Sequence, residues 1–151
     1  MASTSPKIKR MKFSTYIFIA FPCFYLWEQV ETLFSYTQIY TTTNLASFPQ
    51  LITTQSFIIL GALLLTLVFI LLAVNVSRKQ IFTKKNYQIM SNLGGIIFLC
   101  AVVSTSLINR YQLKDIVEFP ITLHISGAIY WFISLIFKIG IKMQEEQDLT
   151  I

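Results

Sequence analysis

Charged side chains are scarce in this chain. Only 13% of its 151 residues are charged, whereas about a quarter are charged in an ordinary soluble domain. Hydrophobic residues make up 54% of the sequence. This balance excludes a typical soluble domain and indicates a protein that faces lipid. The length leaves no room for a second, soluble domain, so we predict a single membrane domain over residues 1–151.

Residues that bind metals or carry out catalysis are also few. The chain has one histidine and two cysteines, Cys23 and Cys100, and both cysteines lie in apolar segments where they are expected to act as small hydrophobes. The sequence has no G-x-S-x-G, no H-E-x-x-H and no phosphate-binding glycine loop. We therefore predict a protein that is not an enzyme and that carries no cofactor and no metal.

The chain does contain long apolar runs. Residues 56–76 contain no charge, and as a helix they would be about 30 Å long, the thickness of a bilayer's hydrocarbon core. Only a helix satisfies the backbone of such a run in lipid. We predict an all-α integral membrane protein, a small bundle of four transmembrane helices. The expected spans are about 13–34, 56–76, 87–108 and 120–141.

The first two spans are joined by a more polar stretch, an outer amphipathic segment of about residues 28–55. Its acidic residues alternate with apolar ones at a spacing that fits an amphipathic helix. Pro49 indicates a break where the chain returns to the membrane. The pattern leaves open whether the segment lies on the outer surface or projects from it.

Positive charge gathers on one side of this arrangement. Ten Lys and Arg residues fall on the side of both termini and the middle loop, and only Arg110 and Lys114 fall on the other. The positive-inside rule places the cation-rich side, with both termini, in the cytoplasm of a multi-pass plasma-membrane protein. Because the cations sit in short clusters beside apolar runs, we expect no direct binding of nucleic acid. The topology signals are Lys7, Lys9, Arg10, Lys12, Arg78, Lys79, Lys84 and Lys85.

His124 is the one imidazole in the chain and falls one turn inside the fourth span. Polar residues within spans are candidates for a functional role, and an unperturbed histidine titrates near pH 6.5. His124 is therefore a candidate pH sensor that would pair with an acid on the outer side. The alternative is an interfacial histidine that only makes a local hydrogen bond. The outer acids are Glu28, Glu31, Asp115 and Glu118.

The cytoplasmic tail, residues 142–151, is polar and acidic. It is too short to fold alone, so it is either a solvated helix end or a docking peptide for a cytoplasmic protein. The candidate docking residues are Glu145, Glu146, Asp148, Leu149 and Ile151.

Small residues at helical spacing, such as Ser91 and Gly95, let helices approach closely. They predict close packing within the chain, with a homo-oligomer as the alternative.

Two segments carry a family resemblance: IFTKKN at residues 81–86 and IFKIGIKMQEEQDLTI at residues 136–151. With four spans in a chain of this length, they resemble the bacterial membrane family called domain of unknown function 2975. Its members share an F-T/S-K-x-N turn and an E-x-D-L-T-I/V tail. The resemblance implies no established activity. It also implies a genomic context that often includes a small helix-turn-helix regulator, which is a candidate partner.

The sequence thus favours a non-enzymatic accessory or sensory membrane component. Its outer acidic and aromatic residues would meet an external signal, and its tail would contact a cytoplasmic partner. The alternatives are a small oligomeric transporter or channel subunit, and a self-protection (immunity) protein against membrane-active peptides. A transporter would usually show paired broken spans or internal repeats, and neither is visible.

Overall fold

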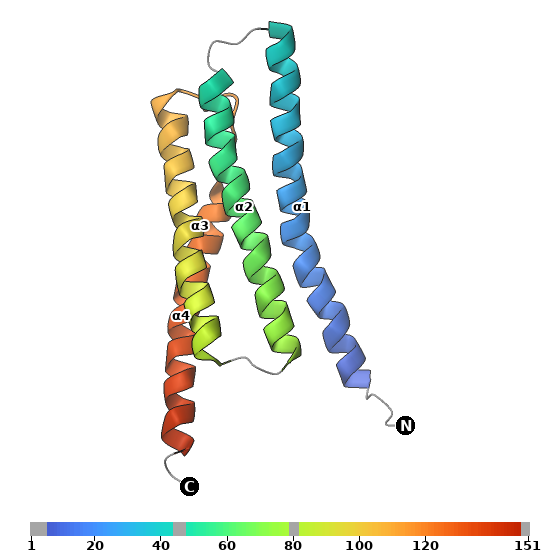
Figure 1. The fold of residues 1–151 in the computed structure, drawn as a ribbon, viewed down its shortest axis with the longest axis vertical. Helices are drawn as coiled ribbons and strands as arrows, with labels where there is room; N and C mark the ends of the chain where they lie inside the picture. The colour runs from blue at the N-terminus through green and yellow to red at the C-terminus, as the bar shows by residue number, and fades with distance from the viewer. Residues whose placement is uncertain (1–5, 44–47, 79–81, 149–151) are drawn as a thin grey trace.

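Four long helices, arranged up and down, make up the protein (Figure 1). The computed structural model describes residues 6–43, 48–78 and 82–148. Successive helices run antiparallel, so that α1 begins and α4 ends at the same end of the molecule, here called the tail end. The helices are α1 (Pro6–Thr43), α2 (Phe48–Ser77), α3 (Lys84–Arg110) and α4 (Ile121–Asp148).

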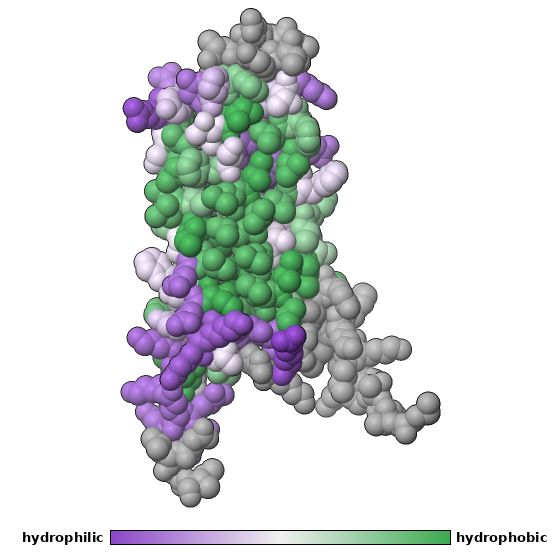
Figure 2. Space-filling view, viewed as in Figure 1, coloured by the Kyte–Doolittle hydropathy of each residue, from purple (hydrophilic) through white to green (hydrophobic). Residues whose placement is uncertain are grey.

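Three of these helices are long and apolar enough to cross a membrane: Phe48–Val76, Lys84–Arg110 and Ile121–Gln147. On the face shown in Figure 2, an apolar surface covers the middle of the molecule, between hydrophilic residues at its two ends. The all-α prediction is confirmed for the described residues, and three of the expected spans fall on α2, α3 and α4. These features are those of a multi-pass membrane protein.

The outer segment expected over residues 28–55 differs from the structure. Residues 28–43 continue α1 without interruption, and α2 already begins at Phe48. Pro49 therefore lies in the first turn of α2, where its missing N–H has no helical partner to lose, and it breaks nothing. The Thr53 hydroxyl donates to the Pro49 carbonyl over 2.8 Å, as it would in any regular helix.

α2 is the central helix, because it packs against each of the others. Its Leu65 and Val68 side chains are almost completely buried, as are Ile97 of α3 and Leu123 of α4. α1 packs along α2 but, among the described helices, not along α3 or α4. A hydrogen bond from the Thr66 hydroxyl to the Pro22 carbonyl, 3.1 Å long, ties the middle of α1 to α2.

α3 and α4 form the most extensive helix pair, and glycines bring their backbones together. A Cβ atom at Gly127 would lie 2.8 Å from the backbone nitrogen of Phe98, and one at Gly94 would lie 2.8 Å from the Tyr130 Cβ. Gly95, by contrast, has nothing within 4 Å of its Cβ position. The expected close packing of small residues within the chain is therefore present at Gly94 and Gly127, while Gly95 takes no part in it.

At the tail end, the α2–α3 turn is fixed to its neighbours. The Thr83 side chain accepts a hydrogen bond from the Asn86 backbone N–H over 3.2 Å, which caps the start of α3. The Phe82 ring lies against Gly140 of α4 and meets the Phe137 ring at a centroid distance of 5.4 Å. The turn and the last third of α4 are thus packed together.

At the opposite end, a ten-residue connection links α3 to α4. Gln112, two residues after the end of α3, has φ 55°, in the left-handed region, and the Leu113 N–H donates to the Ile108 carbonyl over 2.9 Å. This pairing has the geometry of a Schellman motif. The buried side chains of Leu113 and Val117 then anchor the connection, which holds the residues after them in a fixed position.

Candidate functional site

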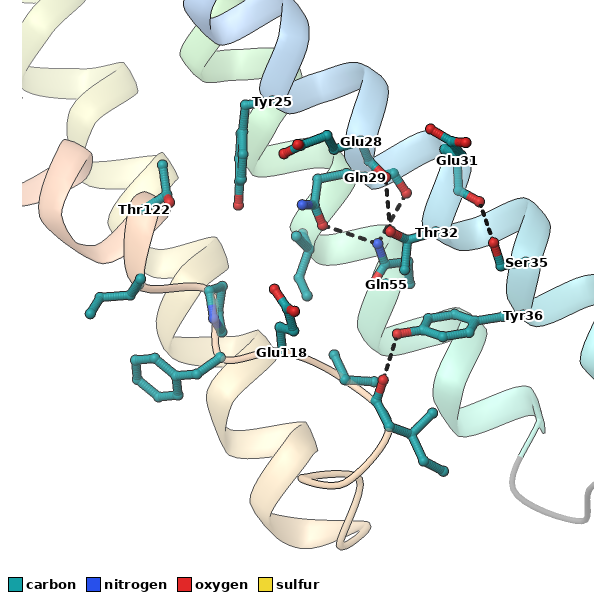
Figure 3. A pocket seen from close by; sticks show the side chains of 16 residues that line it. Tyr25, Glu28, Gln29, Glu31, Thr32, Ser35, Tyr36, Gln55, Glu118 and Thr122 are labelled. Atoms are coloured by element: carbon teal, nitrogen blue, oxygen red, sulfur yellow. Dashed lines mark hydrogen bonds between the residues drawn. The ribbon is translucent and has the colours of Figure 1, made fainter.

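The structure contains a cavity of about 610 Å³ at the end opposite the tail end (Figure 3). Its walls come from the middle of α1, from α2 near Gln55, and from residues 116–122, which include the first turn of α4. The volume lies within the range of about 300–1,000 Å³ typical of small-molecule sites. α1 closes one side of the cavity, and among the described helices its backbone packs closely only along α2, so the space lies between α1 and the α3–α4 connection.

The α1 wall is polar because of its sequence periodicity. Polar side chains recur every three or four residues, so they lie on one face of the helix. All of them line the cavity: Tyr25, Glu28, Gln29, Thr32, Ser35 and Tyr36. Thr32 and Ser35 donate their hydroxyl protons to the Glu28 and Glu31 backbone carbonyls one turn before them. Their hydroxyl oxygens can therefore serve as acceptors toward the cavity.

Three carboxylates give the cavity its charge: Glu28, Glu31 and Glu118. In Figure 3 the Glu28 and Glu118 side chains approach from α1 and from the connection, and Glu31 lies one turn further along α1. The ion pairs within the described residues join other side chains, Lys84 with Glu145 and Lys142 with Glu146. None of the described lining residues is a Lys or Arg, so within the described part of the chain the charge of these carboxylates is not compensated by a lining cation.

Two glutamines form the inner wall, where α1 meets α2. The Gln55 side chain is only 1% exposed, and its Nε2 donates to the Gln29 backbone carbonyl at 3.1 Å and to the Gln29 Oε1 at 3.2 Å. The pair satisfies the Gln55 N–H donors in a position where an unsatisfied donor would be costly. It also fixes the rotation of α1 about its axis relative to α2.

Tyr36 connects α1 to the α3–α4 connection. Its hydroxyl donates to the Ile116 carbonyl over 2.8 Å, across 80 residues of sequence. Burial, and then the negative charge of Glu118, raises the pKa of the Tyr36 phenol above its usual value. The phenol therefore stays neutral at physiological pH and remains a hydrogen-bond donor to the connection.

The expected outer acids are only partly brought together. Glu28, Glu31 and Glu118 line the cavity, whereas Asp115 does not. Sequence analysis missed Gln29, Gln55, Tyr25 and Tyr36 as parts of a site. The periodic polar face of α1 and the isolated amide of Gln55 in an apolar helix were the signals that could have revealed them.

His124 lies outside the cavity lining. Its ring stacks on Phe119 at a centroid distance of 5.1 Å and meets the edge of Phe98 at 5.8 Å, while its Nδ1 lies 3.0 Å from the Pro120 carbonyl oxygen. The carbonyl can only accept, so the Nδ1 is the donor in this hydrogen bond. The pH-sensing role of His124 stays a prediction.

If His124 senses pH, its replacement by alanine should abolish any change in the protein's intrinsic tryptophan fluorescence between about pH 5 and 7, where imidazoles change charge. His124→Gln, which keeps a polar side chain but cannot titrate, should lose the response equally. The measurement is a pH titration of the purified protein in micelles. A response that persists in both variants would show that another group carries it.

The remaining predicted residues lie toward the tail end. Lys7, Lys9, Arg10 and Lys12 fall in the first turns of α1, Arg78 follows α2, and Lys84 and Lys85 begin α3. Lys79, Leu149 and Ile151 lie outside the described residues. The expected tail is helical through Asp148, because α4 continues to that residue. The Lys84 Nζ lies 3.0 Å from the Glu145 Oε1, so the start of α3 and the end of α4 are in contact.

In the described part of the chain, no group of three His, Cys, Asp or Glu residues lies close enough together to hold a metal ion. Cys23 and Cys100 are both free; Cys100 is buried as expected, while Cys23 is exposed on α1.

Comparison with models of protein families gives a match that covers nearly all of the chain. The family model described as "Protein of unknown function (DUF2975)" matches residues 2–151. No curated protein and no solved structure matches the chain. The family match covers essentially the whole sequence, and it confirms the resemblance that residues 81–86 and 136–151 indicated.

Proposed function

Taking as premise that the chain belongs to the DUF2975 family, whose description assigns no activity, we propose that it is a non-enzymatic sensory or accessory component of the plasma membrane. An external ligand binds in the acidic cavity, and a cytoplasmic protein docks on the C-terminal tail. The observation that carries this proposal is the cavity itself, in which three carboxylates face a space of ligand size without a cation among the described lining residues.

The orientation follows from the charges at the two ends. In our proposal all four helices span the bilayer as a small bundle, with α1 as the fourth span and both termini in the cytoplasm. The cations Arg78, Lys84, Lys85 and Lys142 lie at the tail end. The cavity end carries four acids and only two cations, Arg110 and Lys114. The positive-inside rule then places the cavity on the outer side of the membrane.

α4 provides a physical link between the two sides. Its first turn, at Ile121 and Thr122, lines the cavity, and its last turns carry Glu145 and Glu146. A helix of 28 residues is about 42 Å long at 1.5 Å per residue. Because a helix moves as a rigid element, a displacement of its outer end on ligand binding is transmitted to the tail.

The tail would recognise its partner by two kinds of contact. Leu149 and Ile151 would supply apolar contacts, and Glu145, Glu146 and Asp148 would complement a basic surface. The family context makes a helix-turn-helix regulator the candidate partner. A homo-oligomer remains compatible with this role, because Gly95 presents a small surface that the packing within the chain does not use.

Removal of Gln144 to Ile151 tests the proposal. The truncation takes away no apolar span, and acids contribute little to topology, so the protein should still accumulate in the membrane. It also removes the Lys84–Glu145 ion pair, but both side chains are more than half exposed, and such pairs contribute about 0–1 kcal/mol. The measurement is recovery of the cytoplasmic partner by cross-linking in the native membrane, which the truncation should eliminate.

Point variants make this test sharper. Serine at positions 149 and 151 should weaken capture at any salt concentration, while neutralising the three acids should weaken it mainly at low salt. Lys84→Gln is the matched control, since it breaks the ion pair to Glu145 and leaves the tail intact. Equal recovery by the full-length and truncated proteins would refute the docking role. Ligand-independent solute flux through reconstituted vesicles would instead identify a transporter or channel.

A further inference from the structure

We infer that the cavity binds a linear aliphatic polyamine, a chain of ammonium groups separated by short methylene segments. The inference rests on the proposed function, because it names the ligand class of that same outer site. It follows from the sign of the charge in the cavity, from the way that charge is distributed, and from the hydrogen-bonding character of the walls.

The charge of the cavity calls for a cation with more than one positive group. Glu28, Glu31 and Glu118 line it together. Within the described residues, neither of the ion pairs involves any of them. Like charges held near one another repel, and a ligand that neutralises several at once relieves that repulsion. A monovalent cation would leave most of the charge uncompensated.

The distribution of the carboxylates excludes a compact metal ion. Ca²⁺ and Mg²⁺ need several oxygen ligands within about 2.0–2.6 Å of one point. In the described part of the chain no three acidic, His or Cys side chains lie close enough to hold such an ion. Glu28 and Glu31 stand one turn apart on α1, and Glu118 approaches from the connection (Figure 3). Positive charges spaced along a chain match this arrangement, whereas a point charge does not.

The hydrogen-bonding groups of the walls are a further feature that suits such a ligand, beginning with Gln55. Its side chain is 1% exposed and lines the cavity, and its Nε2 is committed to Gln29. The hydroxyl groups of Thr32 and Ser35, which also line the cavity, donate to the Glu28 and Glu31 carbonyls, so their oxygens are available as acceptors. An ammonium group has three donors and no acceptor, which is the complement of an acceptor-lined wall.

Aromatic rings supply the apolar part of the site. Tyr25, Tyr36 and Phe119 line the cavity beside the carboxylates, and Figure 3 shows the Tyr25 ring extending from α1 into the space. Such rings attract alkylammonium groups through their π faces and cover methylene segments. The combination of rings between acids matches a chain in which charged and apolar segments alternate.

The test is calorimetric titration of spermidine into the purified full-length protein in nanodiscs of zwitterionic lipid. Glu118→Gln should weaken binding about tenfold or more, because it removes a charged hydrogen-bond partner. The matched control is Asp115→Asn, which removes one carboxylate from the same connection but not from the cavity lining. We expect the control to keep its affinity within about twofold. Unchanged size-exclusion profiles would exclude misfolding of either variant.

Specific outcomes would overturn the inference. Equal weakening by Glu118→Gln and Asp115→Asn would show general charge attraction, and displacement of spermidine by Mg²⁺ at matched ionic strength would show a metal site. Absence of spermidine binding, or binding of a cationic peptide alone, would exclude the polyamine class. The proposed function has a separate test, the capture of a cytoplasmic partner. Loss of capture on tail truncation supports the proposed function even if spermidine does not bind. Spermidine binding without tail-dependent capture would support the ligand site in the cavity but not the docking role of the tail.

Discussion

Replacing Gly127 by alanine is expected to force α3 and α4 apart and to lower the free energy of unfolding by about 1–3 kcal/mol, the usual cost of overpacking. The new Cβ would lie 2.8 Å from the backbone nitrogen of Phe98 and 2.9 Å from its Cα. These atoms belong to the helix backbone and cannot turn aside as a flexible side chain would. The helices must separate, and contacts along the most extensive helix pair are lost.

Gly95→Ala is the matched control for this experiment. Gly95 lies in α3, the other helix of this pair, and nothing approaches within 4 Å of its Cβ position, so its replacement should cause no loss of stability. The measurement is unfolding of the purified protein in mixed micelles by titration with sodium dodecyl sulfate. Equal losses in the two variants would mean that the α3–α4 contact is not as close as the structure has it.

Reporter fusions should give all-or-none answers about the orientation of the chain. Fusions after Lys85 and after Ile151 are expected to report the cytoplasm, and fusions within residues 41–44 and near Lys114 the outside. The reason is the asymmetry of ten cations to two across the helices. The measurement pairs a reporter active only in the cytoplasm with one active only outside it, each fused at the same four positions.

The position within residues 41–44 is the decisive one, because α1 is the helix whose crossing rests on sequence alone. α1 ends and α2 begins at the cavity end. A cytoplasmic signal from this position, with an external signal near Lys114, would mean that α1 does not cross the bilayer. The proposed four-span topology would then be wrong, and α1 could not form a wall of the cavity next to the α3–α4 connection.

The helices follow from the sequence because apolar runs without charge leave the backbone no other structure in lipid. The ends of the helices were less predictable. Pro49 indicated a break but fits the first turn of α2, since a proline there loses no hydrogen bond. α4 continues to Asp148, about two turns beyond the predicted end of the span at residue 141, because polar residues with good helix propensity extend a helix that has already begun.

The site was less predictable from the sequence than the fold. The outer acids were predicted as a group, but charge alone could not separate Glu118, which lines the cavity, from Asp115, which does not. That difference depends on how Leu113 and Val117 anchor the connection. The convergence of Gln29 and Gln55 depends on the rotation of α1 against α2, which is set by contacts between residues 26 apart in the chain.

Among the described helices α1 packs closely along α2 alone, and this has a consequence for assembly. The contacts among α2, α3 and α4 do not require α1, so these three helices can associate before it joins them. α1 is made first by the ribosome, yet its docking is the step that completes the cavity. A ligand that bridges Glu28 and Glu118 would therefore act as an assembly factor, because it binds only when α1 is docked and so stabilises the assembled state.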